Sequence, residues 1–222
     1  MRGNFMSFVG AVGMSAFFAA SCSMSSMHST HGSAAMGKES AASAADLRVG
    51  LDSLLGEHVL IAAVATSHAL GGREAAFKGA AGGLDANSID IAKAIGSVYG
   101  ADAEKAFLPL WRKHIGFVVD YTTGIAAKDK AKQDKAVNDL IGYTEDFAAF
   151  LSSANPNLPK SAVAELVKGH ILTLKDVIDA QAARDWPKVY SNLRMAAGHM
   201  AMIADPLGTA IAKQFPERYA RQ

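Results

Sequence analysis

Three histidines recur at a fixed interval in this chain of 222 residues. His58, His114 and His170 stand 56 residues apart, and a leucine lies four positions before each of them. Neutral imidazole nitrogens are common ligands of zinc and copper ions, so histidines at equivalent places in a repeat could converge on a metal. A regular spacing of this length is typical of a helical repeat. The spacing therefore predicts a repeated unit that presents one histidine per copy.

The residues around the three histidines follow the period of an α-helix. Apolar residues stand seven and four positions before each histidine and four positions after it, on one helix face. The second half of each unit repeats in the same way, and turn-forming residues separate the halves, as at Gly71-Gly72 and Asp185-Trp186-Pro187. The sequence predicts an all-α fold, a six-helix bundle of three antiparallel αα-hairpins with a 56-residue repeat, and helices over 46–70, 74–99, 102–127, 130–154, 160–184 and 187–214.

Two prolines and three glycines interrupt these predicted helices. Pro109 falls inside the third helix and Pro206 inside the sixth. Because proline lacks an amide hydrogen and clashes with the preceding turn, we expect both helices to be kinked or shortened. Gly79, Gly82 and Gly83 weaken the second helix by about 1 kcal/mol each relative to alanine.

The repeated histidines and their partners across each turn define one level of the bundle. Residues equally distant from the turn of a helical hairpin lie at the same height, and the residue 29 positions after each histidine meets this condition. The predicted layer contains His58, Asn87, His114, Tyr143, His170 and His199. One turn further along the second helix of each hairpin come Asp90, Asp146 and Met202.

Within this layer, His114, His170 and His199 are the predicted metal ligands, with His58 as the fourth candidate. The middle repeat supplies the first of them, and the third hairpin supplies the next two. Five neighbours are expected to support the ligands from outside, and Tyr143 could also offer an oxygen; they are Tyr143, Asn87, Asp90, Asp146 and Met202. Because only neutral imidazole coordinates, we expect binding to weaken as the pH falls through about 6.5.

The sequence leaves two interpretations of the histidine layer open. In the first, the imidazoles share a metal ion. Copper is favoured because methionines stand beside His199, zinc is the second choice, and haem is a weaker one. In the second, the layer is a structural ladder in which each histidine forms a hydrogen bond with a neighbouring helix. Cys22 is the only cysteine, so thiolates cannot hold a metal within the helical region.

The first 45 residues have the composition of a targeting segment and a tether. An apolar stretch follows Arg2 and ends in Ala19-Ala20-Ser21-Cys22, which predicts a lipoprotein-like signal peptide over 1–22 with acylation at Cys22. Residues 23–45 are rich in serine, alanine, methionine and histidine, as in a flexible linker that could also collect copper. The helical repeat domain would occupy 46–222. The sequence thus predicts an extracytoplasmic protein of the cell envelope, anchored to the membrane through a lipid.

Charge and motif content narrow the function classes. The formal net charge is +1, which gives no electrostatic basis for binding nucleic acid. The Glu-x-x-His pairs of ferritin-like iron sites and the His-x-x-x-Glu pairs of hemerythrin-like sites are both missing around the four histidines of the layer. A zinc-protease His-Glu-x-x-His, a Gly-x-Ser-x-Gly elbow and a phosphate loop are missing too. We therefore expect a binding protein rather than an enzyme.

Two segments carry a resemblance to known sequences. They run from Trp111 to Thr122 and from Gly198 to Pro216, and through them about residues 48–218 resemble a group of uncharacterised bacterial secreted helical-repeat proteins, often labelled copper amine oxidase-like. The Asn-Tyr-Asp/Glu cofactor motif of true copper amine oxidases is not matched by Asp120-Tyr121-Thr122, so the resemblance implies copper but not the oxidase reaction. The predicted function is envelope metal binding, for copper sequestration, buffering or delivery. Alternatives are a metal-free scaffold that binds another envelope protein, and a haem-binding or redox protein.

Overall fold

The computed structural model describes residues 43–219, which are helical almost throughout. The all-α prediction is confirmed, and each main helix begins and ends within two residues of its expected bounds. The helices are α1 (Ala44–Leu70), α2 (Glu74–Tyr99), α3 (Ala101–Ala126), α4 (Lys130–Ala154), α5 (Lys160–Ala183), α6 (Trp186–Gln214) and the short α7 (Pro216–Tyr219). The predicted signal peptide, Cys22 and most of the predicted linker lie outside the described residues.

Side-chain caps fix several of the helix starts. The Ser43 hydroxyl accepts a hydrogen bond from the Asp46 amide, and the Asp46 carboxylate accepts one from the Ser43 amide, so α1 begins with a complete capping box. Asp129 caps α4, and Asp185 caps α6 with Pro187 in the first turn, as the sequence predicts. These caps satisfy amide groups that a helix start would otherwise leave without partners.

The two internal prolines do not shorten their helices. The helix α3 runs from Ala101 to Ala126 through Pro109, and α6 runs from Trp186 to Gln214 through Pro206. Apolar residues on both sides of each proline are buried, such as Phe107 and Trp111 around Pro109. The packing of these neighbours offsets the lost hydrogen bond, so of the two expected outcomes, a kink or a shortened helix, shortening does not occur.

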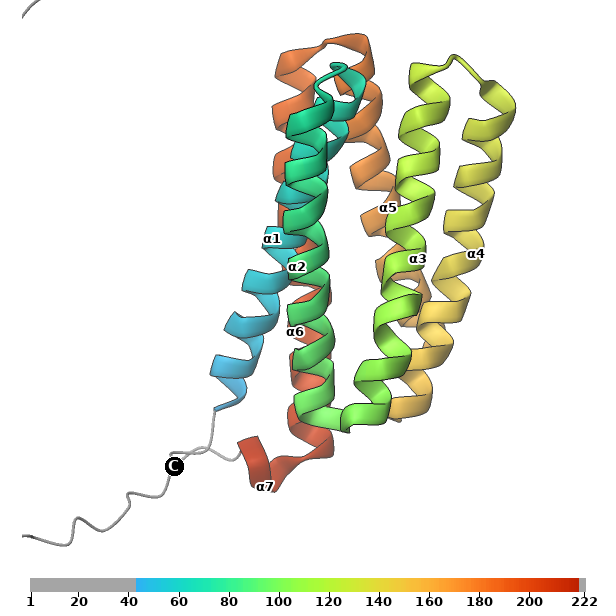
Figure 1. The fold of residues 1–222 in the computed structure, drawn as a ribbon. Helices are drawn as coiled ribbons and strands as arrows, with labels where there is room; N and C mark the ends of the chain where they lie inside the picture. Colours follow the sequence, from blue (N-terminus) through green and yellow to red (C-terminus); the bar gives the residue numbers. More distant parts are fainter. Residues whose placement is uncertain (1–42, 220–222) are drawn as a thin grey trace, which may run out of the picture. The chain divides into compact units, whose positions relative to one another are not determined.

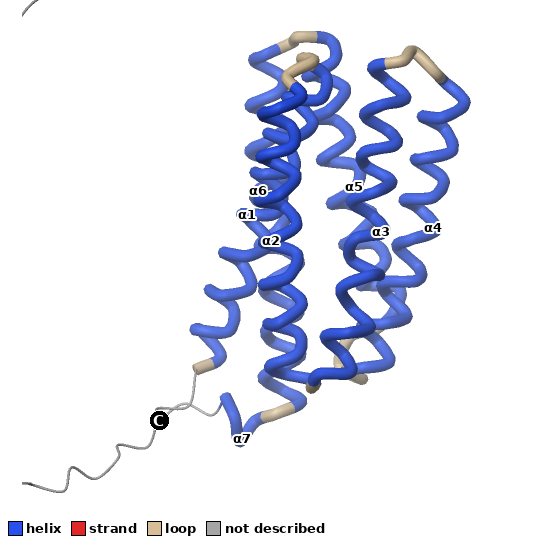
Figure 2. The backbone as a smooth tube through the Cα atoms, viewed as in Figure 1, coloured by secondary structure: helices blue, strands red, loops and turns tan. Residues whose placement is uncertain are grey.

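The six main helices pack in sequence order, each antiparallel to the next. In addition α6 packs against α1, which joins the last helix to the first (Figure 1). The helices α1, α3 and α5 also contact one another, whereas α2 and α4 pack on the helices before and after them in sequence and α6 packs on α5 and α1 (Figure 2). The odd-numbered helices therefore line the interior of the bundle, and a side chain on the inner face of each can reach the other two.

Apolar burial accounts for the composition of α1. This helix is long and apolar enough to cross a membrane, judged by length and composition alone. Its apolar residues include Leu51, Leu55, Val59 and Ala62, which are all buried against the rest of the bundle. Packing in the core explains these residues, whereas Val49, Leu60 and Val64 of the same helix are exposed.

Candidate metal centre

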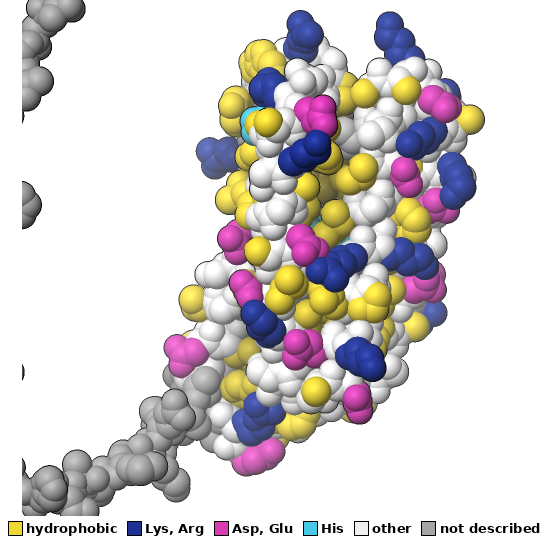
Figure 3. Space-filling view, in the orientation of Figure 1, with side chains coloured by type: hydrophobic (Ala, Val, Ile, Leu, Met, Phe, Trp, Pro, Cys, Tyr) yellow, Lys and Arg dark blue, Asp and Glu magenta, His cyan; other side chains and the backbone are white. Residues whose placement is uncertain are grey.

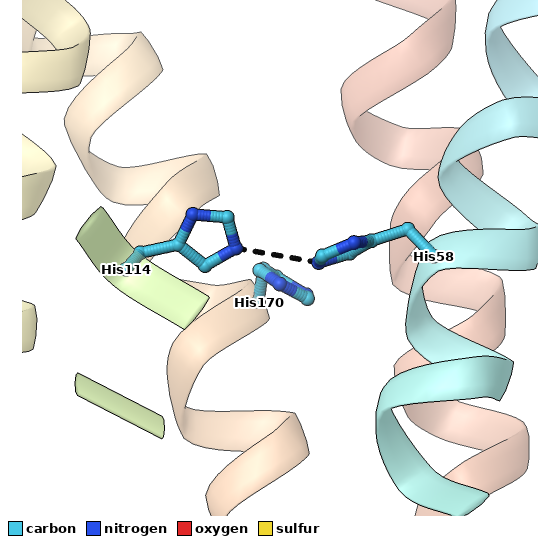
Figure 4. A group of neighbouring side chains, drawn as sticks. All are labelled: His58, His114 and His170. Carbon is cyan, nitrogen blue, oxygen red and sulfur yellow. Dashed lines mark hydrogen bonds between the residues drawn. The ribbon is translucent and has the colours of Figure 1, made fainter. Parts of the chain in front are cut away.

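Three of the histidines meet inside the bundle. His58 comes from α1, His114 from α3 and His170 from α5, and their rings point toward one another (Figure 4). One nitrogen of each lies within 4.8 Å of the corresponding nitrogens of the other two. Their exposed fractions are 1%, 3% and 6%, so bulk water does not solvate them. We call these residues the histidine trio; it could bind a metal ion.

The closest approach within the trio has the spacing that a shared ion requires. The Nε2 atoms of His58 and His114 lie 3.3 Å apart. Two nitrogens that each lie about 2.0–2.1 Å from a tetrahedral zinc ion are roughly 3.3–3.4 Å from each other. The His170 ring lies beside both, with its centroid 5.8 Å from that of His58 and 6.4 Å from that of His114.

The packing of the odd-numbered helices explains why these histidines converge. In α1, His58 lies between the buried residues Leu55 and Ala62 on one helix face. His114 and His170 occupy the corresponding buried faces of α3 and α5. Since α1, α3 and α5 contact one another in the interior, their buried faces bring the three rings to the same place.

Burial keeps the trio in the neutral form that coordinates metals. Desolvation lowers the pKa of His114 from 6.5 to about 3 and that of His170 to about 4, and neighbouring histidines add to both shifts. The pKa of His58 is also well below 6.5, first through burial and then through His114 and His170. In the folded protein, burial therefore shifts proton competition for these nitrogens to a pH below the 6.5 expected from the sequence.

Several buried polar atoms around the trio have no protein partner. The Nδ1 atoms of His58 and His170, the indole Nε1 of Trp111 and the hydroxyl of Tyr143 form no hydrogen bond with any described residue. The Nδ1 atom of His114 also lacks a partner of good geometry, although the backbone of Trp111 lies near enough to that ring to raise its pKa slightly against the larger effect of burial. A buried polar group without a partner costs about 1–3 kcal/mol, and such groups in folded proteins commonly mark a bound water or ion. Their concentration at one place fits a site that takes up a ligand, and three neutral imidazoles are a donor set that suits zinc or copper.

His199 is the one predicted ligand that lies apart from the trio. Its Nε2 is 2.8 Å from the backbone oxygen of Leu166, to which it donates when that nitrogen carries the proton. The ring lies over Gly169, where an added Cβ would be 2.6 Å from the ring carbon Cε1. His199 belongs to α6, outside the interior group of helices, and it is tied to the backbone of α5. Equal distance from the hairpin turn predicted the height of His199 in the bundle. It could not predict which helices line the interior.

The predicted supporting residues divide into a buried pair and three surface residues. Tyr143 is buried with its ring centroid 5.1 Å from that of His114. Asn87 is also buried, and its amide donates to the Leu54 carbonyl and to the Glu57 carboxylate. The other three lie on the surface. Asp90 forms an ion pair with Lys93 and Asp146 forms one with Lys113, while Met202 is 58% exposed.

Helix geometry explains the surface position of the two carboxylates and Met202. The core face of α2 continues from Asn87 to Ile91, and that of α4 continues from Tyr143 to Phe147, four residues later in each case. A residue three positions later is turned by about 60° from that face in an α-helix. On an outer helix this rotation leads to solvent. Among the described residues, no carboxylate joins the group of possible ligands around the trio.

A small cavity adjoins the trio on one side. Its volume is about 50 Å³, and its polar lining residues are His114, His170 and Tyr143. Trp111 and Met200 also line it, and the remaining walls are aliphatic or phenylalanine side chains. The Trp111 ring centroid is 4.7 Å from that of His114 and 4.9 Å from that of His58. Sequence reasoning missed Trp111 as a site residue, although it is the one aromatic among the residues three positions before the repeated histidines.

A larger hollow on the surface is separate from the trio. It measures about 490 Å³ and lies between α1, α2 and α3, where apolar side chains are visible between the two front helices (Figure 3). Its lining includes Ala81 and Leu84 of α2, and Asp85 and Arg112 form a two-pronged ion pair beside it. None of the three trio histidines lines this hollow, so it is not part of the candidate metal centre although it is larger than the cavity beside the trio.

The arrangement could bind a metal ion through neutral nitrogen ligands. It has no nucleophile paired with a base and, among residues 43–219, no carboxylate placed to assist the three imidazoles. No protein family, characterised protein or solved structure shows a significant match to this chain, so the geometry of the trio carries the functional argument.

Proposed function

We propose that this is an exported, envelope-anchored metal-binding protein whose histidine trio holds one copper ion, for sequestration, buffering or delivery. The observation that carries the proposal is the meeting of three fully desolvated, neutral imidazoles within 4.8 Å of one another. A structural ladder would give each histidine its own hydrogen-bond partner. Here His58 and His114 instead meet each other through their Nε2 atoms, 3.3 Å apart, so these two rings have no separate partners at the nitrogens that converge.

The charge of the site supports monovalent copper. Three neutral ligands leave the whole charge of the ion inside a buried core, and the cost of burying a charge rises with its square. A Cu(I) ion therefore costs about one quarter as much to desolvate as a divalent ion of similar size. Met200 adds a thioether to the wall of the adjoining cavity, and soft sulfur ligands favour Cu(I).

The proposed location of the protein in the cell envelope rests on its sequence. The apolar stretch before Cys22 and the Ala-Ala-Ser-Cys end support export and lipid anchoring. The following methionines and histidines, among them His28 and His31, would offer a second, weaker collection point for the same ion. A tether that collects copper and a buried site that retains it would suit buffering or delivery.

The test is anaerobic titration of the full chain with Cu(I) against a competing chelator. Wild type, His114→Ala and His170→Ala are compared with His199→Ala, which removes a histidine of the same bundle outside the trio. We expect the two trio variants to lose about 100-fold or more in affinity for one ion, while His199→Ala keeps the wild-type affinity. The N-terminal segment is identical in all four proteins, so the difference reports the trio. Equal affinities in all four would reject the site.

A further inference from the structure

We infer that α6 carries a second Cu(I) site on the surface of the bundle, formed by Met195, His199 and Met202. The inference rests on the proposed function in taking copper as the ion, and it adds a site whose ligands differ from those of the trio. His199 follows Met195 by four residues and precedes Met202 by three, so all three lie on one face of the helix. Met200, by contrast, is buried in the core.

The His199 ring is held in the form that a metal ligand needs. Its Nε2 lies 2.8 Å from the backbone oxygen of Leu166, which can only accept, so in the neutral ring Nε2 carries the proton and Nδ1 keeps its lone pair. Metal-binding histidines commonly donate their second ring N–H to a backbone carbonyl in this way. The Nδ1 atom has no hydrogen-bond partner among residues 43–219 and does not belong to the buried polar atoms, so it is open to solvent.

Gly169 of α5 makes room for this ring. A Cβ added at position 169 would lie 2.6 Å from Cε1 of His199 and 2.8 Å from its Nε2, closer than real Cβ atoms approach their neighbours. The packing of α6 on α5 therefore fixes the orientation of the imidazole. Because Gly169 directly precedes His170, the surface site lies beside a ligand of the trio.

Both thioethers are within reach of an ion bound to Nδ1. Side chains three and four residues apart on a helix have Cβ atoms about 5–6 Å from each other, and Met195 and Met202 stand at these spacings from His199. A methionine side chain has three rotatable bonds, and the two residues are 55% and 58% exposed. Each sulfur can therefore turn toward the ion without movement of the backbone.

The ligand set selects the ion and its affinity. Thioether sulfur favours Cu(I), whereas zinc prefers thiolate, imidazole and carboxylate ligands. Because the two methionines are exposed, binding must order side chains that are free in the unbound protein, and we expect a lower affinity than at the trio. A chelator that competes with the trio therefore empties the surface site, and His199→Ala remains a valid control for the trio. A weaker, exposed site suits the exchange of ions during buffering or delivery.

The experiment is anaerobic Cu(I) titration of the full chain labelled with carbon-13 at the methionine methyl groups, followed by NMR. Met195→Leu and Met202→Leu assign the two signals. We expect both signals to shift together with Cu(I) and to stay in place with Zn(II). Met202→Leu should weaken the binding reported by Met195 by about 10-fold, and His199→Gln should weaken it at least as much.

His68→Ala is the matched control. His68 is also a partly exposed histidine of the bundle, but no methionine lies on the helix turns beside it. The methyl shifts of Met195 and Met202 should be the same in this variant as in wild type. Shifts that persist in His199→Gln, or that Zn(II) reproduces, would overturn the inference, because the methionines would then respond without the proposed ligand set.

The Cu(I) affinity of the trio, measured on the same variants against a chelator, separates the two proposals. Met195→Leu and Met202→Leu should leave this affinity unchanged. Methionine signals that stay in place while the trio is occupied would overturn this inference alone. Shifted signals without tight binding at the trio would overturn the proposed function and support the surface site by itself. Loss of both would overturn both.

Discussion

The Nε2 atoms of His58 and His114 lie 3.3 Å apart although 56 residues separate them in the chain. Without an ion, one of these neutral rings donates its Nε2 hydrogen to the other. The donor ring then has a bare Nδ1 lone pair, and the acceptor ring has an Nδ1 hydrogen, and neither finds a partner among the described residues. An ion between the rings would replace this contact with two coordinate bonds.

The stability of the metal-free protein should fall with acid between pH 6.5 and about 4. In this range the unfolded chain protonates its histidines, while His114 and His170 stay neutral in the folded state because their pKa values are about 3 and 4. The unfolded state then binds more protons, so the free energy of unfolding decreases by up to about 1.4 kcal/mol per pH unit for each buried histidine. Urea unfolding followed by circular dichroism from pH 8 to pH 4.5 measures the slope. A His114→Leu variant should have the smaller slope, and identical slopes would contradict the buried neutral state.

The tryptophan fluorescence should report copper binding through one of the two tryptophans. Trp111 is buried with its ring 4.7 Å from the ring of His114, whereas Trp186 is 49% exposed at the start of α6. Copper in the trio should therefore quench the blue-shifted emission of Trp111 and leave the emission of Trp186. Titration of wild type and Trp111→Phe makes the comparison. If Trp111→Phe shows the same quenching as wild type, the ion lies elsewhere.

Alanine substitutions at three helix glycines should change the stability in different directions, because two of the positions are open and one is packed. Gly116 and Gly142 are exposed, and an added Cβ at either would meet nothing within 4 Å, so alanine there should stabilise the protein by about 0.5–1 kcal/mol. Gly169→Ala should destabilise it, because the new methyl group displaces His199 from its contact with Leu166. Thermal unfolding checks all three. An equal gain at Gly169 would mean that His199 moves aside freely.

The two acidic residues beside the predicted layer should not matter for metal binding. Asp90 and Asp146 form ion pairs on the surface and lie outside the group of possible ligands. Asp90→Asn and Asp146→Asn should change stability by less than about 1 kcal/mol and leave the Cu(I) affinity within about twofold of wild type. A loss comparable with that of His114→Ala would mean that the carboxylates reach the ion when it is bound.

The histidine spacing predicted most of the fold, and it named all three residues now found close together, with His58 as the fourth candidate. Periodicity specifies which residues share a helix face, and short links make consecutive helices antiparallel, so the helix bounds and the levels of His114 and His170 follow from the sequence. The level of a residue does not specify which helices line the interior. That arrangement depends on the contacts among α1, α3 and α5, and it is why His58 rather than His199 completes the trio.

Which residues surround the site depends on small differences in angular position around each helix, and the spacing of the histidines does not predict these. Asp146 lies three residues after Tyr143, and the core face of α4 passes instead through Phe147, one residue later. The cavity could not be predicted either, because it results from the shapes of side chains on several helices. Trp111 offered a usable signal: a single large aromatic replaces the aliphatic residue that stands at the corresponding place in the other two units.

Each ligand of the trio comes from a different helical hairpin, and the first and last are separated by more than half of the chain. No isolated hairpin therefore contains a site, and a nascent chain that has completed only α1 to α4 holds two of the three ligands. Tight copper binding would accordingly be a property of the finished tertiary structure. The ion would act as a cross-link that joins all three hairpins after α5 is in place, so the bound protein should resist local unfolding and proteolysis in every hairpin at once.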